Sequence, residues 1–308
     1  MSRDAFSHDP QDPRDLSPAL SATRYKRIPS TPRGDRDTRG ETNARHDTRE
    51  RDKPREAQSA AERDYYVRDR AYRLRDSEIH SMKEIGTFRV IAAPDLVKYA
   101  YGENRERMEA DLRRLKREAL VSEKTLEISQ KKTLRVVTLT KAGHRLLKRT
   151  SQLPDDQALY HGLLQWREAQ HDADLYRLYQ KEVDRIERAG GRPIRVILDY
   201  EIKRDLNRDL ALLGPEKDDP ALKQGVAEKH GLVIVNGRIP VPDMRVEYED
   251  AELVLQRVDL ELATREYRPR SLAEKAKAGF AIYGRAEDAS RLHRILDERE
   301  LTREIFTL

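Results

Sequence analysis

The length of 308 residues allows two domains, or one domain with a long extension. Charged residues make up 38% of the chain and hydrophobic residues 37%, and this average composition is too polar for a single globular domain. Cysteine is absent, which excludes disulfides, thiolate zinc sites and a cysteine nucleophile; neither a membrane-spanning apolar run nor a signal peptide is recognisable, so we expect a cytoplasmic protein without a membrane partner. The net charge of +5, from 61 basic and 56 acidic residues, favours an anionic partner, but the positions of the basic residues must decide.

Residues 1–62 are predicted to form a disordered charged tail. Arg, Asp, Pro, Ser and Thr dominate this stretch, which has no apolar periodicity. Such a sequence cannot offset its ordering entropy by burying surface. From about Asp64 onward, apolar residues recur at helical and strand spacings, so the folded part is expected to begin there.

Residues 63–152 are predicted to form a winged helix-turn-helix domain. A first helix is expected from Asp64 to Ile85, followed by a short helix from Leu96 to Tyr101. Gly102 ends the short helix, and Asn104 caps a third helix. Two short helices joined through a glycine turn are the helix-turn-helix unit.

The third helix is expected to present a strongly basic surface. Met108, Leu112 and Leu115 lie at i, i+4 and i+7 and form its buried stripe. The basic residues around the rest of this helix are Arg105, Arg107, Arg113, Arg114, Lys116 and Arg117.

A hairpin is expected after the third helix, with strands Thr125–Ser129 and Leu134–Leu139, and another helix begins near Thr140. Lys131 and Lys132 lie in the turn of this hairpin, which would be the wing. The complete order is that of a winged helix.

Double-stranded DNA is the partner that these positions favour. Arg105 and Arg107, near the N-terminus of the third helix, are placed to reach base edges in the major groove, while Lys131 and Lys132 would meet phosphates. The alternative is a protein-binding winged helix with a solvated charged face, because acidic residues such as Glu106 dilute the charge.

Residues 153–308 are predicted to form a second domain of the α/β or α+β class. Its expected elements are a helix Gln157–Ala189, strands Ile194–Ile202, Leu232–Glu247 and Glu252–Ala263, helices Ser271–Tyr283 and Ala286–Arg299, and an apolar end Ile305–Leu308. The fold class of the whole chain is therefore α+β.

Strand alternation places Asp243 on one strand, and Asp259 and Glu261 on the next, where the three carboxylates could converge. A magnesium ion takes oxygen ligands of this kind and can activate a water beside a phosphate. On the pattern alone, acidic residues on one strand face are more often simply solvated.

Residues 70–283 resemble the replication-relaxation family of bacterial mobile elements and plasmids, which is related to a class of mobilisation relaxases. The segments that carry this resemblance are Leu74–Ile79, Gly86–Val90, Asp111–Leu115, Leu139–Gly143, His171, Pro242–Asp243, Asp259–Glu261, Lys275, Lys277 and Tyr283. Their order along the chain is more specific than any one of them.

The resemblance implies a winged helix joined to a domain similar to the PD-(D/E)xK nuclease fold. Asp243 would be the first metal carboxylate and Glu261 the second, with magnesium as cofactor. The position two after Glu261, where that fold usually has lysine, is Ala263. Lys275 or Lys277 on the following helix would then supply the catalytic lysine.

Other residues have two interpretations each. His171 and Asp174 could join the site, although an isolated histidine on a helix is more often structural. Glu201, expected on the first strand of the second domain, is either an auxiliary ligand or half of a solvated ion pair. The tyrosines before the winged helix suit packing better than a nucleophilic role; they are Tyr65, Tyr66 and Tyr72.

Two functions therefore remain open. The first is a DNA-binding protein of a plasmid or integrative element that acts at an origin-like site, with partner proteins of a replication or mobilisation complex, and nicks DNA with magnesium. The alternative is a non-catalytic winged-helix regulator or replication accessory protein. Ala263 favours the alternative, and the three carboxylates favour the first.

Overall fold

The computed structural model describes residues 62–67, 70–129, 132–150, 153, 156–162, 168–264, 267–298 and 305–308. The predicted tail, residues 1–62, lies outside the described residues except for Glu62. The described residues all belong to one compact unit, Lys53–Leu308. This unit contains both helices and strands, as expected for the α+β class.

The first helix, predicted from Asp64 to Ile85, is wrong in its N-terminal half, where the structure has a β-hairpin. Strands β1 (Glu62–Val67) and β2 (Arg70–Arg75) pair antiparallel, and helix α1 (Asp76–Phe88) follows. Tyr72 and Leu74 are buried while Arg73 between them is exposed, which is the two-residue period of a strand. The helix also continues past its expected end at Ile85, so Gly86 lies inside α1.

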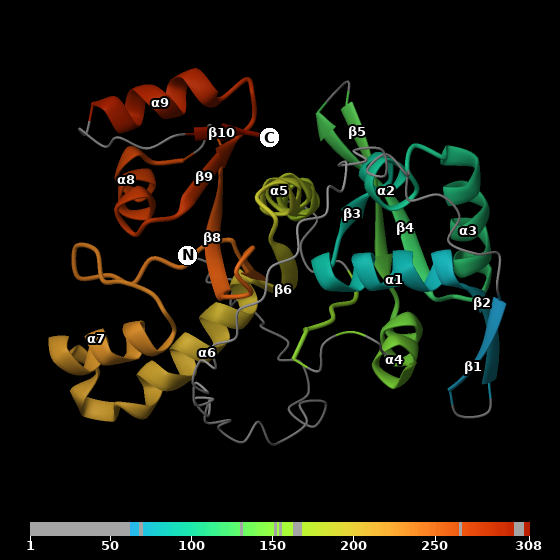
Figure 1. The fold of residues 1–308 in the computed structure, drawn as a ribbon, viewed down its shortest axis with the longest axis horizontal. Coiled ribbons are helices and arrows are strands. Elements are labelled where there is room, and N and C mark those ends of the chain that lie inside the picture. Colours follow the sequence, from blue (N-terminus) through green and yellow to red (C-terminus); the bar gives the residue numbers. More distant parts are fainter. Residues whose placement is uncertain are drawn as a thin grey trace, which may run out of the picture. The chain divides into compact units, whose positions relative to one another are not determined.

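The next elements have the order that the sequence predicts. They are β3 (Ile91–Ala92), α2 (Ala93–Ala100), α3 (Arg105–Arg117), β4 (Val121–Ser129), β5 (Lys132–Leu139) and α4 (Lys141–Thr150). The three strands form an antiparallel sheet in the order β3-β5-β4, and the helices lie around it (Figure 1). Asn104 caps α3 by accepting a hydrogen bond from the backbone of Arg107, as predicted.

Helix α5 (Ala169–Arg188) begins later than the predicted Gln157. Residues 157–160 are not helical, and the side-chain amide of Gln157 donates to the Val196 carbonyl and accepts from the Val196 N–H. The Gln157 side chain thus occupies backbone groups at the edge of strand β6 (Arg192–Leu198). Helix α5 ends close to the expected Ala189, and Gly190 and Gly191 follow it, with Gly190 at φ 82°. Leu163 and Trp166, expected in this helix, lie outside the described residues.

A mixed five-stranded sheet follows, in the order β10-β9-β8-β7-β6. The elements after β6 are α6 (Asp199–Leu212), a short 3-10 helix (Gly214–Asp218), α7 (Pro220–Lys229), β7 (Met244–Glu249), β8 (Leu255–Ala263), α8 (Pro269–Lys277), β9 (Ala281–Gly284), α9 (Ala289–Asp297) and β10 (Ile305–Thr307). Strands β6, β7 and β8 pair antiparallel, whereas β9 runs parallel to both β8 and β10.

Three boundaries in this part differ from the prediction. The strand from Ile194 ends at Leu198, because Ile202 and Leu206 are buried at helical spacing in α6. The expected strand Leu232–Glu247 is a strand only from Met244, and a tight turn at Asn236 and Gly237 precedes it. The helix expected from Ser271 to Tyr283 ends at Lys277, so Tyr283 is on β9.

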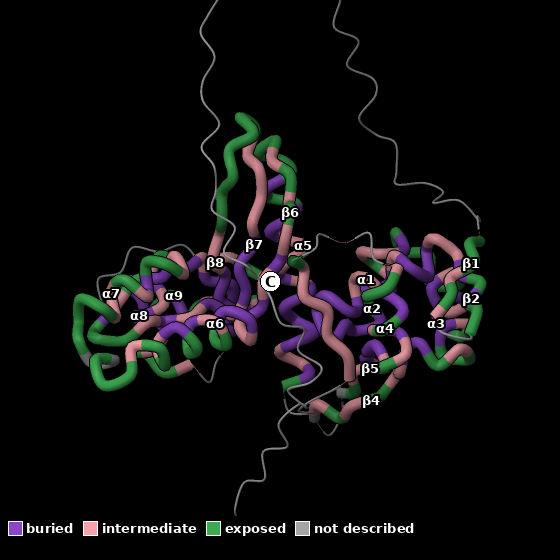
Figure 2. Tube along the Cα trace, turned by 90° about the horizontal axis from the view of Figure 1, so that it is seen from below, coloured by how far each residue is buried: buried purple, intermediate pink, exposed green. Residues whose placement is uncertain are grey.

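One hydrophobic cluster connects the two parts of the unit. It contains Phe88 of α1 and Tyr176 of α5, whose rings meet edge to face at 5.1 Å, together with Met244 and Leu260 of the five-stranded sheet. In the tube view, the chain is buried near the start of β7 and the end of β8, whereas the end of β7 is half-buried and the start of β8 is exposed (Figure 2). No helix of the described part is long and apolar enough to span a membrane.

Candidate functional site

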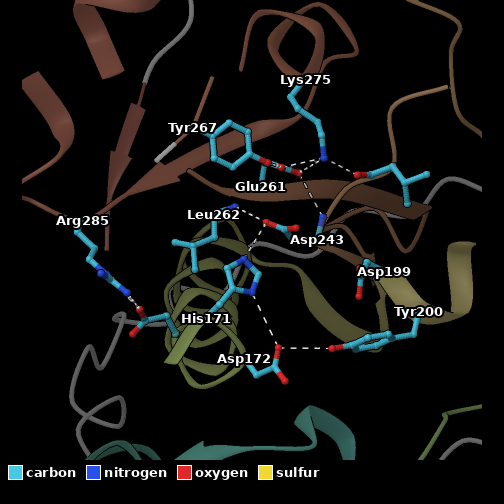
Figure 3. A network of polar contacts seen from close by, with 12 residues as sticks. His171, Asp172, Asp199, Tyr200, Asp243, Glu261, Leu262, Tyr267, Lys275 and Arg285 are labelled. Atoms are coloured by element: carbon cyan, nitrogen blue, oxygen red, sulfur yellow. Dashed lines mark hydrogen bonds and ion pairs between the residues drawn. The ribbon is translucent and has the colours of Figure 1, made fainter. Parts of the chain in front are cut away.

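Asp243 and Glu261 lie side by side at the buried ends of β7 and β8. The antiparallel register pairs Met244 with Leu260, which brings the residues just beyond them, Asp243 and Glu261, opposite each other. The backbone N–H of Asp243 donates to the Glu261 carboxylate at 3.3 Å, and the Asp243 carboxylate accepts from the backbone N–H of Leu262 at 2.9 Å (Figure 3). Strand pairing thus joins two acids that are distant in sequence.

Lys275, from helix α8, completes an acid–lysine cluster. Its ammonium group lies 2.8 Å from the Glu261 carboxylate and donates to the Val241 carbonyl at 2.6 Å. Its side chain is only 16% exposed. Lys277 is exposed on the same helix. Of the two lysines suggested as substitutes for the one missing at Ala263, the structure brings only Lys275 to the acids.

Glu261 is fully buried, and its surroundings perturb its titration. Burial raises its pKa to about 7, the charge of Asp243 raises it too, and the contacts from Lys275 and Tyr267 oppose this shift. The Tyr267 hydroxyl donates to the other Glu261 oxygen. Glu261 therefore exchanges a proton near neutral pH.

Asp243 is held by a histidine on α5. The His171 Nε2 atom lies 3.5 Å from the Asp243 carboxylate, and its Nδ1 atom lies 3.9 Å from Asp172. Burial alone would lower the pKa of His171, but the two carboxylates raise it to about 10. Burial would likewise raise the pKa of Asp243, yet His171 and Lys275 keep it below its usual value. The two carboxylates therefore favour the protonated, cationic form of His171.

Asp259 does not join the two acids, which corrects the expected convergence of three carboxylates. Its carboxylate takes two hydrogen bonds from the Arg245 guanidinium, at 2.6 and 2.9 Å, because the register places these residues opposite each other. Within the described ranges, no group of three or more His, Asp or Glu side chains is arranged to hold a metal ion. Of the three predicted ligands, Asp243 and Glu261 are thus the two that lie together.

Two carboxylates still fit a magnesium ion. Magnesium usually keeps several waters and takes only one or two protein carboxylates plus phosphate oxygens of a substrate. Asp243 is partly open to solvent, with 18% of its side chain exposed. Oxygen donors of this kind match a hard cation, which at Glu261 would have to replace the contact of Lys275 or of Tyr267.

Two other predicted candidates lie apart from this cluster. Glu201 is on α6 and accepts a hydrogen bond from Tyr160 at 2.9 Å, with Arg195 at 3.4 Å. Asp174 forms ion pairs with Arg177 and Arg285. Both acids are therefore engaged in structural pairs.

Of the tyrosines considered as nucleophiles, Tyr72 is a core residue of β2, whereas Tyr66 on β1 is 68% exposed. Tyr65, also on β1, packs partly buried against the main core cluster. The structure places all three on the first hairpin, and none of them is among the residues that contact Asp243 or Glu261.

Helix α3 offers a second candidate surface, for nucleic acid. Arg105, Arg113 and Arg117 are exposed, and Arg107 is half-exposed. Arg114 and Lys116, also predicted to bind DNA, instead have partners within the chain: Arg114 contacts Glu62 and Glu78, and Lys116 contacts Glu123 at 2.6 Å. Lys131 lies outside the described residues, as does the side chain of Lys132.

A buried polar network fixes the orientation of α3. The fully buried Asp111 accepts hydrogen bonds from Ser77 at 2.6 Å, Arg75 at 3.0 Å and Tyr101 at 3.1 Å. A buried carboxylate is stable only with such partners. The network therefore ties α3 to α1 and α2.

Sequence reasoning missed Tyr267 and underrated His171. Tyr267 follows Glu261 by six residues in a segment without periodicity, so no local pattern indicates its contact. His171 precedes Asp243 by a long stretch of sequence, and only the packing of α5 on the sheet brings them together.

No protein-family model matches the chain, and no curated protein matches it. Among solved structures, PadR of Bacillus subtilis, in a crystal structure with operator DNA, matches with 13% sequence identity over 51% of this chain and 92% of the PadR chain. The TM-score of this match is 0.22, which is too low to establish a shared fold. The geometry of the two candidate surfaces must therefore carry the functional argument.

Proposed function

We propose that this chain is a DNA-binding protein that uses a metal-dependent acid–lysine site to nick DNA. The observation that carries the proposal is the placement of Lys275 2.8 Å from Glu261, which itself contacts Asp243. These groups come from two strands and a following helix, in an order that matches the core expected for a PD-(D/E)xK nuclease-like domain. Residues 153–308 would form that domain.

Asp243 and Glu261 would hold the magnesium ion. Bound there, magnesium would supply a Lewis acid and a water of lowered pKa beside the phosphodiester. Lys275 has a defined task as well: its ammonium group stabilises negative charge that develops on the phosphate oxygens. Its bonds to Glu261 and Val241 hold it in place before substrate binds.

The remaining part, residues 63–152, is proposed to act as a winged helix that binds double-stranded DNA. Its element order and its sheet order β3-β5-β4 fit that architecture. Arg105, Arg113 and Arg117 would face the DNA, since they are exposed on α3. With the resemblance to the replication-relaxation family, an origin-like site of a plasmid or integrative element is the proposed target.

A test needs a DNA that the protein binds, which selection from a random duplex library supplies. Cloned into a supercoiled plasmid, the selected sequence should be nicked by wild-type protein with magnesium or manganese. Lys275→Met should lower the rate by about 10²- to 10³-fold, as expected for one lost charge contact in the transition state. Lys277→Met is the matched control and should nick the plasmid at the wild-type rate, because Lys277 is exposed.

A second function is favoured by one observation. The acids are already satisfied within the chain: both Glu261 oxygens have partners in Lys275 and Tyr267, and His171 neutralises Asp243. Such a cluster also suits a structural role in a non-catalytic DNA-binding regulator. Binding of the selected DNA without any nicking in magnesium or manganese would make this the better account.

A further inference from the structure

Arg89, directly after α1, occupies a strained turn. Its backbone has φ 65° and ψ −52°, and the N–H of Val90 donates to the carbonyl of Phe88 at 2.7 Å, which closes a γ-turn. A γ-turn with positive φ is rare and strained in a residue with a Cβ atom. Arg89 is nevertheless only 6% exposed. The turn thus directs a permanently charged side chain into the interior.

The Arg89 guanidinium lies over two tyrosine rings. Its central carbon is 3.8 Å from the ring centroid of Tyr200 and 4.9 Å from that of Tyr160. Both distances are within the range of a cation–π contact, which is stronger when the cation is shielded from water. Arg89 therefore orders two residues of the C-terminal part from a turn in the N-terminal part.

The two tyrosines lead to different carboxylates. Tyr160 donates to Glu201 at 2.9 Å, which is apart from the acid–lysine cluster. Tyr200 makes a long hydrogen bond of 3.5 Å to Asp172, next to His171 (Figure 3). His171 in turn lies 3.5 Å from the Asp243 carboxylate. Only the Tyr200 branch reaches the candidate site.

We propose that Arg89 is a positioning residue that, through Tyr200, Asp172 and His171, fixes the carboxylate of Asp243. This proposal rests on the proposed function in so far as it treats Asp243 as a ligand of the metal ion. It also gives the site a physical link to the DNA-binding part, because Arg89 ends α1 and Ser77 at the start of α1 bonds to Asp111 of α3. Asp243 is then best ordered when α1 and α3 hold their positions.

The two tyrosines allow a matched test. Tyr200→Phe and Tyr160→Phe each remove one hydroxyl and keep the ring on which Arg89 stacks. In full-length protein labelled with ¹³C at histidine Cε1, the His171 signal is assigned with His171→Gln. Tyr200→Phe should shift this signal and weaken Mn²⁺ binding, measured by calorimetry, about 2- to 10-fold, the size of one weak hydrogen bond. Tyr160→Phe should leave both unchanged.

Arg89→Gly removes the guanidinium and also the backbone strain, so it should not unfold the protein. It should shift the His171 signal and weaken Mn²⁺ binding as Tyr200→Phe does. The double variant Arg89→Gly/Tyr200→Phe should be no worse than the stronger single variant, because both act on the same path.

Equal effects of Tyr160→Phe and Tyr200→Phe would overturn the proposal, as would a His171 signal that Arg89→Gly does not move. A shifted His171 signal with unchanged Mn²⁺ affinity would also overturn it, because Asp243 would not depend on the path. If wild-type protein binds no Mn²⁺ and nicks no DNA, the proposed function fails separately. The His171 signal then decides alone whether Arg89 and Tyr200 act on the cluster.

Discussion

Replacing Lys275 by methionine should reduce stability in a way that depends strongly on pH. The substitution keeps the apolar stem of the side chain but removes the charge that lies 2.8 Å from the buried Glu261 carboxylate. Lys275 lowers the pKa of Glu261, which is about 7 in the folded protein against 4.5 for a free glutamate. Without Lys275, the pKa of Glu261 should therefore rise above 7.

The sign follows from proton linkage. A carboxyl group whose pKa is raised on folding makes the protein lose stability as pH rises from its unfolded pKa to its folded pKa, by about 1.4 kcal/mol per pH unit. In the wild type this loss stops near pH 7, where folded Glu261 is ionised. In Lys275→Met the loss continues to higher pH, so by pH 9 proton linkage should add up to about 3 kcal/mol to the difference that the missing hydrogen bonds already cause at pH 6.

Urea unfolding at several pH values between about 6 and 9 measures this difference. At pH 6 the variant should lose only about 1 kcal/mol, the size of the missing hydrogen bonds. Lys277→Met, on the exposed side of the same helix, should follow the wild type at every pH. A loss in Lys275→Met that is as large at pH 6 as at pH 9 would refute the coupling between Lys275 and Glu261.

Three further predictions concern the metal, helix α3 and its charges. The affinity for Mn²⁺ should rise by up to about tenfold per pH unit below pH 7 and level off above it, because Glu261 must lose its proton to act as a ligand. Calorimetry at several pH values measures this affinity, and a pH-independent affinity would contradict the role of Glu261 as a ligand. Asp111→Ala should lower the free energy of unfolding, measured with urea, by about 3 kcal/mol or more, because three hydrogen-bond donors around this buried site lose their acceptor. A decrease below about 1 kcal/mol would contradict the role of this network in stability. Arg113→Ala should reduce by about 1 the slope of the logarithm of affinity for duplex DNA against the logarithm of salt concentration. Lys116→Ala should change this slope less, because Lys116 is paired with Glu123. Equal effects of the two variants would argue against the proposed α3 interface.

The sequence predicted those parts of the fold whose signals are local. Helix α3 is an example, because Asn104 caps it and Met108, Leu112 and Leu115 form a buried stripe within three turns. Residues 157–160 were predicted wrongly as helix, because the side chain of Gln157 bonds to Val196, a partner 39 residues away. Partners this far apart leave no periodicity in the sequence.

At the candidate site, too, the sequence could not indicate contacts between residues that are far apart in the chain. Strand alternation correctly placed Asp243 and Glu261 on one face, but it could not show that Asp259 is opposite Arg245, which requires the register between β7 and β8. The choice of Lys275 over Lys277 depends on which side of α8 packs on the sheet.

The central claim is that Asp243 takes part in metal-dependent cutting of DNA, and Asp243→Asn tests it most directly. The substitution keeps the size of the side chain and removes the charge that a metal ion requires. On supercoiled plasmid carrying the selected sequence, wild-type protein should nick one strand with magnesium or manganese, and Asp243→Asn should bind the same DNA with nearly unchanged affinity but not nick it. Nicking by Asp243→Asn at the wild-type rate, or binding by wild-type protein without nicking in either metal, would contradict the account.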